Sequence, residues 1–247
     1  MNKYIDRIRL SADALKIIAC ISMLIDHISY GLLNYYMTRF HMDIVPQTYT
    51  KLNTIYKFGH SIGRIAFPIF CFFLVEGFFR TRNLNKYMAR ILLLAVISEI
   101  PFDLALYHTP LSMTNQNTLF TLFTGLTMMC LLKYIKEGIP YLPDTQKVIA
   151  SLCAVAGFAE LASLAHLDYT YKGMLLIATL YFLRGLKDLQ LISGAAITAI
   201  FETCGSVAFL PLYFYDPEVK PRFKYLFYCF YPAHLILIYL VALLLFR

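Results

Sequence analysis

The chain has 247 residues, of which 59% are hydrophobic and only 15% are charged. A soluble domain carries about 25% charged residues, so this chain lacks the polar surface that a soluble globular enzyme needs. Disordered proteins are poor in apolar residues and rich in net charge, and the same composition excludes that class. The remaining class is an all-α, polytopic helical membrane protein, in agreement with a mean hydropathy of +0.61.

The charge balance is basic, with 22 lysines and arginines against 15 acids and a net charge of +7. We expect no nucleic acid as a partner, because membrane proteins concentrate basic residues in their cytoplasmic loops. The six cysteines lie in apolar runs without CxxC spacing, which indicates small packing residues and neither a disulfide framework nor a metal site.

A bilayer core needs about 20 apolar residues for each spanning helix. The sequence predicts one transmembrane domain over residues 1–247, with eight spanning segments at residues 14–36, 58–79, 86–107, 118–135, 147–164, 171–183, 189–210 and 225–246. Basic residues gather beside alternate segment ends, which predicts that both termini lie on the cytoplasmic side of a bacterial inner membrane.

Ionisable side chains inside spanning segments are costly and are candidates for function by default. Asp26 and His27 lie twelve and thirteen residues into the first segment, about 20 Å deep at 1.5 Å per residue. Glu99 and Asp103 are four residues apart and share one helix face. The group expected to meet in the outer half of the bilayer, as the catalytic layer, consists of Asp26, His27, Arg64, Glu99, Asp103 and His234.

Within this layer His27 is the predicted general base, because imidazole exchanges a proton near neutral pH. Asp26 either orients His27 or forms a hydrogen bond elsewhere, since neighbours on a helix point about 100° apart. His234 with Tyr231 is the other candidate base. Arg64 could also serve only as a structural partner of a facing carboxylate.

Two further groups of polar residues flank the predicted spans. The predicted substrate-binding loops contain Asn115, Asn117, Asp168, Tyr169 and Lys172. The predicted cofactor-binding cluster at the inner face contains Glu76, Arg80, Arg82, Lys86 and Arg90. Arginine suits forked contacts with phosphate, although basic residues at this position could reflect topology alone.

Several sequence runs together resemble the TraX family. They are MLIDH at 23–27, GRIAFPIF at 63–70, LVEG at 74–77, SEIPFD at 98–103, FTL at 120–122 and FYPAH at 230–234. The likeness covers almost the whole chain and is densest between residues 15 and 122.

The resemblance implies an integral-membrane acyltransferase that uses acetyl-CoA as acyl donor. The founding member is linked to N-terminal acetylation of pilin, and the wider superfamily moves acyl groups to a protein or glycan acceptor. A histidine in an early helix is the usual proposed base, which here is His27. The basic cluster would then hold the phosphates of acyl-CoA, and Arg64 or Asn117 would stabilise the oxyanion.

Two other classes of function fit the buried charges. A proton-coupled secondary transporter also places acids, histidine and arginine inside the membrane. A non-catalytic assembly factor for a surface structure is the third class.

Overall fold

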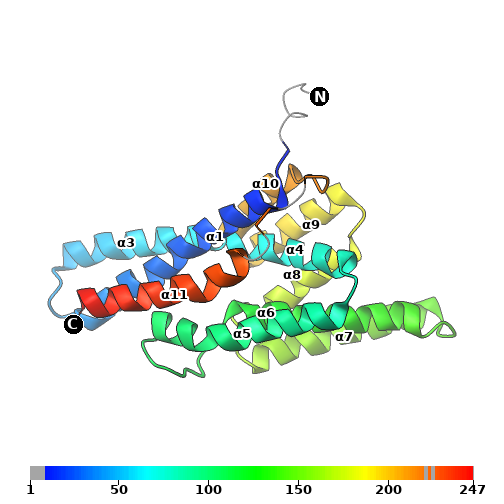
Figure 1. Cartoon of the computed structure of the whole chain (residues 1–247), viewed down its shortest axis with the longest axis horizontal. Helices are drawn as coiled ribbons and strands as arrows, with labels where there is room; N and C mark the ends of the chain where they lie inside the picture. The colour runs from blue at the N-terminus through cyan, green and yellow to red at the C-terminus, as the bar shows by residue number, and fades with distance from the viewer. Residues whose placement is uncertain (1–8, 220–221, 224–225, 247) are drawn as a thin grey trace. The chain divides into compact units, whose positions relative to one another are not determined.

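The computed structural model describes residues 9–219, 222–223 and 226–246, and over these ranges it contains helices and turns but no strand. The predicted all-helical class is confirmed (Figure 1). The elements are α1 (Ala12–Ile28), η2 (Ser29–Asn34), α2 (Tyr35–Arg39), α3 (Pro46–Gly63), α4 (Ala66–Arg80), α5 (Leu84–Leu106), α6 (Thr118–Lys133), η3 (Tyr134–Gly138), α7 (Asp144–Leu164), α8 (Thr170–Phe182), α9 (Lys187–Phe201), η4 (Thr203–Ala208), α10 (Phe209–Tyr213) and α11 (Leu226–Leu245).

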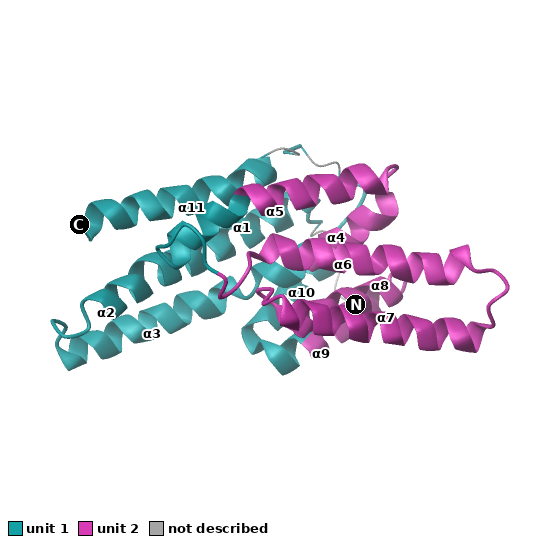
Figure 2. Ribbon diagram, turned by 90° about the horizontal axis from the view of Figure 1, so that it is seen from below, with its two compact units in different colours: residues 1–70, 98–112, 198–247 teal, residues 71–97, 113–197 magenta. Residues whose placement is uncertain are grey.

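The chain forms two compact units that alternate along the sequence (Figure 2). Unit 1 comprises residues 1–70, 98–112 and 198–247, and unit 2 comprises residues 71–97 and 113–197. Three of the four boundaries fall inside α4, α5 and α9, and the fourth lies in the loop between α5 and α6. A single transmembrane domain stays a prediction.

In unit 1, helix α1 packs against α3 and α11. Two glycines on α3, four residues apart, allow this close approach. A Cβ atom added at Gly59 would collide with the side chain of Ser29, and one at Gly63 would collide with Asp26. Small residues at i and i+4 are the usual means by which membrane helices come close together.

In unit 2, helices α6, α7 and α8 pack against one another in pairs. Helix α6 begins where the side chain of Asn117 accepts a hydrogen bond from the Leu119 amide at 3.0 Å, which satisfies one free donor of the first turn. Gly125 on α6 lies directly against Ile177 of α8. The core of this unit is aliphatic and fully buried, with Met128, Met129, Leu132, Met174, Ile177 and Leu180.

Five helical stretches of the described chain are long and apolar enough to cross a membrane, whereas the sequence predicted eight. They are Ala12–Arg39, Pro46–Arg80, Thr118–Gly138, Asp144–Leu164 and Leu226–Leu245. Helices α8 and α9 have 13 and 15 residues, fewer than the roughly 20 that a span needs. Helix α5 has 23 residues, but it carries four charged side chains.

Two predicted boundaries were wrong. Helix α3 begins at Pro46, inside the predicted connection, because proline suits the first position of a helix. The predicted segment 189–210 is not one helix, since α9 ends at Phe201 and Glu202 adopts a non-helical conformation with φ −147° and ψ 82°. Glu202 therefore lies at a break between α9 and η4.

Candidate functional site

A pair of buried histidines from the two ends of the sequence forms the centre of the candidate site in unit 1. Nδ1 of His27, in the last turn of α1, lies 2.7 Å from Nε2 of His234 on α11. The two rings are nearly coplanar, with an angle of 4° and a centroid distance of 5.0 Å. This arrangement is what an in-plane hydrogen bond between two imidazoles requires.

The direction of this hydrogen bond follows from a third contact. Nδ1 of His234 lies 2.8 Å from the carbonyl oxygen of Phe230, and a carbonyl can only accept. His234 therefore carries its proton on Nδ1, and in the neutral ring its Nε2 is an acceptor. His27 must then donate from Nδ1, which leaves a lone pair on its Nε2.

Aromatic rings enclose the histidine pair. The rings of Phe102 and Tyr231 meet His27 edge-on at 6.5 and 6.3 Å, and the ring of Phe230 stacks on His234 at 4.6 Å. His27 is 7% exposed and His234 is 5% exposed. These walls keep bulk water from the pair and limit rotation of both imidazoles.

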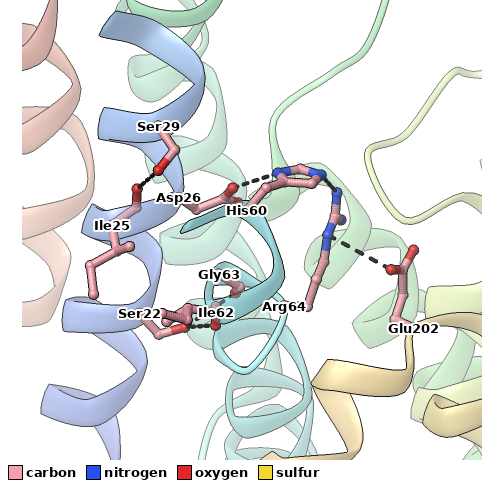
Figure 3. A network of polar contacts seen from close by, with 9 residues as sticks. All are labelled: Ser22, Ile25, Asp26, Ser29, His60, Ile62, Gly63, Arg64 and Glu202. Atoms are coloured by element: carbon pink, nitrogen blue, oxygen red, sulfur yellow. Dashed lines mark hydrogen bonds and ion pairs between the residues drawn. The ribbon is translucent and has the colours of Figure 1, made fainter. Parts of the chain in front are cut away.

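Asp26 does not orient His27 but contacts His60. Its Oδ1 lies 2.6 Å from Nδ1 of His60 on α3, and Nε2 of His60 is in contact with Nη2 of Arg64 (Figure 3). Nε of Arg64 lies 3.8 Å from Oε2 of Glu202. We call these four residues the Arg64 network.

Sequence reasoning missed His60, although it lies near the start of the predicted segment 58–79. The i, i+4 spacing of His60 and Arg64 was the available signal, since such residues share a helix face. Arg64 itself lies in the turn between α3 and α4. Ser22 of α1 supports this turn by donating its hydroxyl to the carbonyls of Ile62 and Gly63, at 2.6 and 3.3 Å.

The two predicted acids of α5 have different surroundings. Asp103 is 1% exposed, and its Oδ2 accepts a hydrogen bond from the Ser112 amide at 2.8 Å. Asp103 therefore fastens the loop that follows α5, while the neighbouring Phe102 packs against His27. Glu99 is half-buried one turn earlier. A catalytic role of either acid stays a prediction.

In unit 2, the predicted substrate-binding residues connect two loops. Asn117 is fully buried, caps α6 and donates to the Ala95 carbonyl at 2.9 Å. The Thr118 hydroxyl donates to Asp168, and the Gln116 amide donates to the His166 carbonyl at 2.9 Å. The remaining three are Asn115 in the same loop, Tyr169 before α8 and Lys172 in its first turn. These contacts give Asn117 and Asp168 a structural role, and substrate binding stays a prediction.

The basic cluster of unit 2 is organised around Glu76. Its Oε2 lies 2.9 Å from Nη2 of Arg80, and its Oε1 lies 3.1 Å from Nε of Arg184. The Arg184 guanidinium also covers the ring of Phe79 at 4.5 Å. Arg184 was not expected as a partner of Glu76, because it lies 108 residues away in sequence.

The other members of the cluster, Arg82, Lys86 and Arg90, are exposed. Exposed guanidinium and ammonium groups suit phosphate groups, whereas Glu76 would repel them. Glu76 therefore acts through the two arginines that it holds. Within the described ranges, no three His, Cys, Asp or Glu side chains are grouped closely enough to hold a metal ion.

Comparison with known proteins identifies a relative and a family for this chain. Over 96% of its length the chain is 29% identical to a probable fimbrial assembly protein, FimC of serogroup H1, from Dichelobacter nodosus, and the match covers 97% of that protein. No solved structure matches the chain. The sequence profile described as TraX protein matches residues 11–242, nearly the whole chain. The protein therefore belongs to the TraX family.

Proposed function

We propose that this protein is an integral-membrane acyltransferase that moves an acetyl group from acetyl-CoA to an amine or hydroxyl of a protein or glycan acceptor. The observation that carries the proposal is the His27–His234 pair, because its hydrogen-bond directions leave a lone pair on Nε2 of His27. A buried imidazole with a fixed tautomer is well suited to act as a general base.

The proposed reaction uses His27 as a proton shuttle. The acceptor nitrogen or oxygen attacks the thioester carbon as Nε2 of His27 takes its proton. The C–S bond then breaks, and the imidazolium returns the proton to the departing thiolate of CoA. His234 stabilises the imidazolium by accepting the hydrogen bond from Nδ1 of His27.

For the donor, we propose that the exposed basic residues of unit 2 bind the phosphates of acetyl-CoA. The group consists of Arg80, Arg82, Lys86, Arg90 and Arg184. Phosphate binding by forked guanidinium groups supports this assignment, and it is tested by binding measurements that are independent of transfer.

The cellular setting is also proposed. The name of the fimbrial assembly relative supports a role connected with pili, and we propose the bacterial inner membrane as the location. Both termini would lie in the cytoplasm, as the distribution of basic residues suggests. This topology requires an even number of crossings, which is reached if α5, with 23 residues, crosses in addition to the five long apolar stretches.

The experiment uses purified protein in vesicles with acetyl-CoA that is radiolabelled in the acetyl group. Surface proteins and glycans from a strain that lacks this protein serve as acceptors. We expect label to enter one of these fractions only when the protein is present. If folded protein that binds CoA transfers no label to either fraction, the proposal is wrong.

A non-catalytic assembly factor is the second candidate, favoured by the name of the same relative. It predicts that a chain without the His27 imidazole still supports assembly of the surface structure. Loss of assembly together with loss of label transfer would instead favour the enzyme.

A further inference from the structure

The Arg64 network is separate from the histidine pair, although Asp26 and His27 are adjacent on α1. Its four side chains are all partly accessible, with exposed fractions of 17% for Asp26, 32% for His60, 20% for Arg64 and 31% for Glu202. Ionisable groups inside a membrane domain are costly, and mutual pairing alone would account for their presence. The directions of the hydrogen bonds indicate a more specific role for this network.

A guanidinium group has only donors, so His60 must accept the contact from Arg64 with a lone pair on Nε2. The single proton of neutral His60 is then on Nδ1, where it is donated to Asp26 at 2.6 Å. A doubly protonated His60 would direct an N–H toward the N–H of Arg64. The observed contact therefore exists only while His60 is neutral.

Arg64 is held from two directions. His60 binds Nη2, and Glu202 lies 3.8 Å from Nε. Both Arg64 and Glu202 occupy breaks between helices, where the backbone is not constrained by a continuous helix. The second break packs closely on the first, because a Cβ atom added at Gly205 would lie 3.0 Å from the carbonyl oxygen of Arg64. Irregular backbone at membrane depth is typical of functional sites.

We propose that Asp26 and His60 position the Arg64 guanidinium for stabilisation of negative charge during acyl transfer, and that they do so only while His60 is neutral. This inference rests on the proposed function. His60 and Asp26 are positioning residues in this scheme, and Arg64 is the group that faces the developing oxyanion.

The charged and titratable groups around His60 all belong to unit 1. Asp26 and His27 come from α1. Tyr56, one turn earlier on α3, stacks on the His60 ring with a centroid distance of 5.7 Å. Arg64 and Glu202 complete the set. The pH dependence below is therefore that of a coupled group with two acids and one permanent cation.

The test compares two substitutions of His60 across pH with the labelled transfer assay. The amide of His60→Gln can donate to Asp26 and accept from Arg64, but it does not titrate near neutral pH. In the scheme both His27 and His60 must be neutral, so each adds one proton to the acid limb of the pH–rate profile. We expect His60→Gln to keep the rate at pH 8 within about 3-fold and to reduce the limiting acid slope of the logarithm of the rate by one relative to wild type.

The second variant, His60→Leu, removes the hydrogen bonds to both neighbours. We expect it to lower the rate about 10- to 100-fold at every pH, as misplacement of a catalytic group does. His41→Gln, at an exposed histidine of unit 1, is the matched control and should behave as wild type. An acid slope in His60→Gln equal to that of wild type, or a wild-type rate in His60→Leu, would overturn the inference.

A spectroscopic measurement separates this inference from the proposed function. Nitrogen-15 NMR of histidine-labelled protein at pH 8, with the His60 signals identified by their loss in His60→Gln, reports the tautomer directly. A proton on Nδ1 of His60 is expected, and a proton on Nε2 would contradict the positioning scheme even if the protein transfers acetyl groups. Failure of the wild-type protein to transfer label would contradict the proposed function. The NMR measurement of the His60 tautomer would still test whether Asp26 and His60 position Arg64.

Discussion

The two polar regions of the molecule are built in opposite ways. In unit 1, the His27–His234 pair is buried, and the neighbours of its ring nitrogens determine which atom donates and which accepts each hydrogen bond. In unit 2, the cluster around Glu76 is formed by long side chains at the surface, and Arg80 is 46% exposed. Buried hydrogen bonds are strong and specific, whereas exposed ion pairs contribute about 0–1 kcal/mol.

This difference teaches where function can be inferred from geometry. The contacts of the buried pair determine which nitrogen of each ring carries the proton, so they indicate the chemistry that is open to His27. The contacts of the exposed cluster show only that several cations lie beside one carboxylate. Substitutions should therefore have large effects on rate in unit 1 and small effects on stability in unit 2.

The largest effect is expected for His27→Gln, which removes the lone pair on Nε2 and keeps a polar side chain. We expect label transfer to fall about 100- to 10,000-fold, the usual contribution of a general base. CoA binding should stay within about 2-fold of wild type, because the donor phosphates are proposed to bind in unit 2. Transfer at the wild-type rate would show that His27 is not the base and would remove the contrast between the regions.

An intermediate effect is expected for packing, where one glycine in each unit can be compared. A Cβ atom at Gly31 would lie 2.6 Å from the backbone oxygen of Ala105 and 2.9 Å from Ile238. Gly31→Ala should lower the free energy of unfolding by about 1–3 kcal/mol. A Cβ atom added at Gly157 on α7 would have no neighbouring atom within 4 Å, and Gly157→Ala should raise the free energy of unfolding by about 0.5–1 kcal/mol. Thermal unfolding in detergent checks both, and equal midpoints would contradict the expectation.

The smallest effect on stability is expected for Glu76→Gln. Loss of two exposed ion pairs should change the free energy of unfolding by less than about 1 kcal/mol. The released guanidinium charges should strengthen CoA binding, seen as a larger CoA-dependent shift in the unfolding temperature. Glu137→Gln is the matched control, because Glu137 pairs with Lys133 at an exposed i, i+4 position of the same unit. Loss of CoA binding in Glu76→Gln would mean that the carboxylate itself contacts the donor.

Much of the helical organisation could be predicted from sequence. The expected start at Thr118 is confirmed, because Asn117 is a strong cap before an apolar run. The segment 86–107 corresponds closely to α5, which continues through Pro101. The break at Glu202 was missed because a single non-helical residue between apolar stretches leaves no periodic signal, although Gly205 follows it closely.

The candidate site could be predicted in its residues but not in its pairings. His27, His234, Asp26 and Arg64 were all identified, since charge inside apolar segments is rare. The partners of Asp26 and Glu76 could not be found this way, because they depend on which helix faces pack together. His60, inside the predicted segment 58–79, and Arg184, which the sequence assigns to topology alone, supply these partners.

The sequence separation of the histidine pair has a consequence for biosynthesis. His27 belongs to α1, while His234 belongs to α11, 207 residues later in the sequence. The base is therefore synthesised well before the partner that fixes its tautomer, and it obtains that partner only when α11 has been inserted. A nascent chain that has not yet reached α11, or one truncated before it, would carry the proposed base in an unaligned form, so competence would depend on insertion of α11.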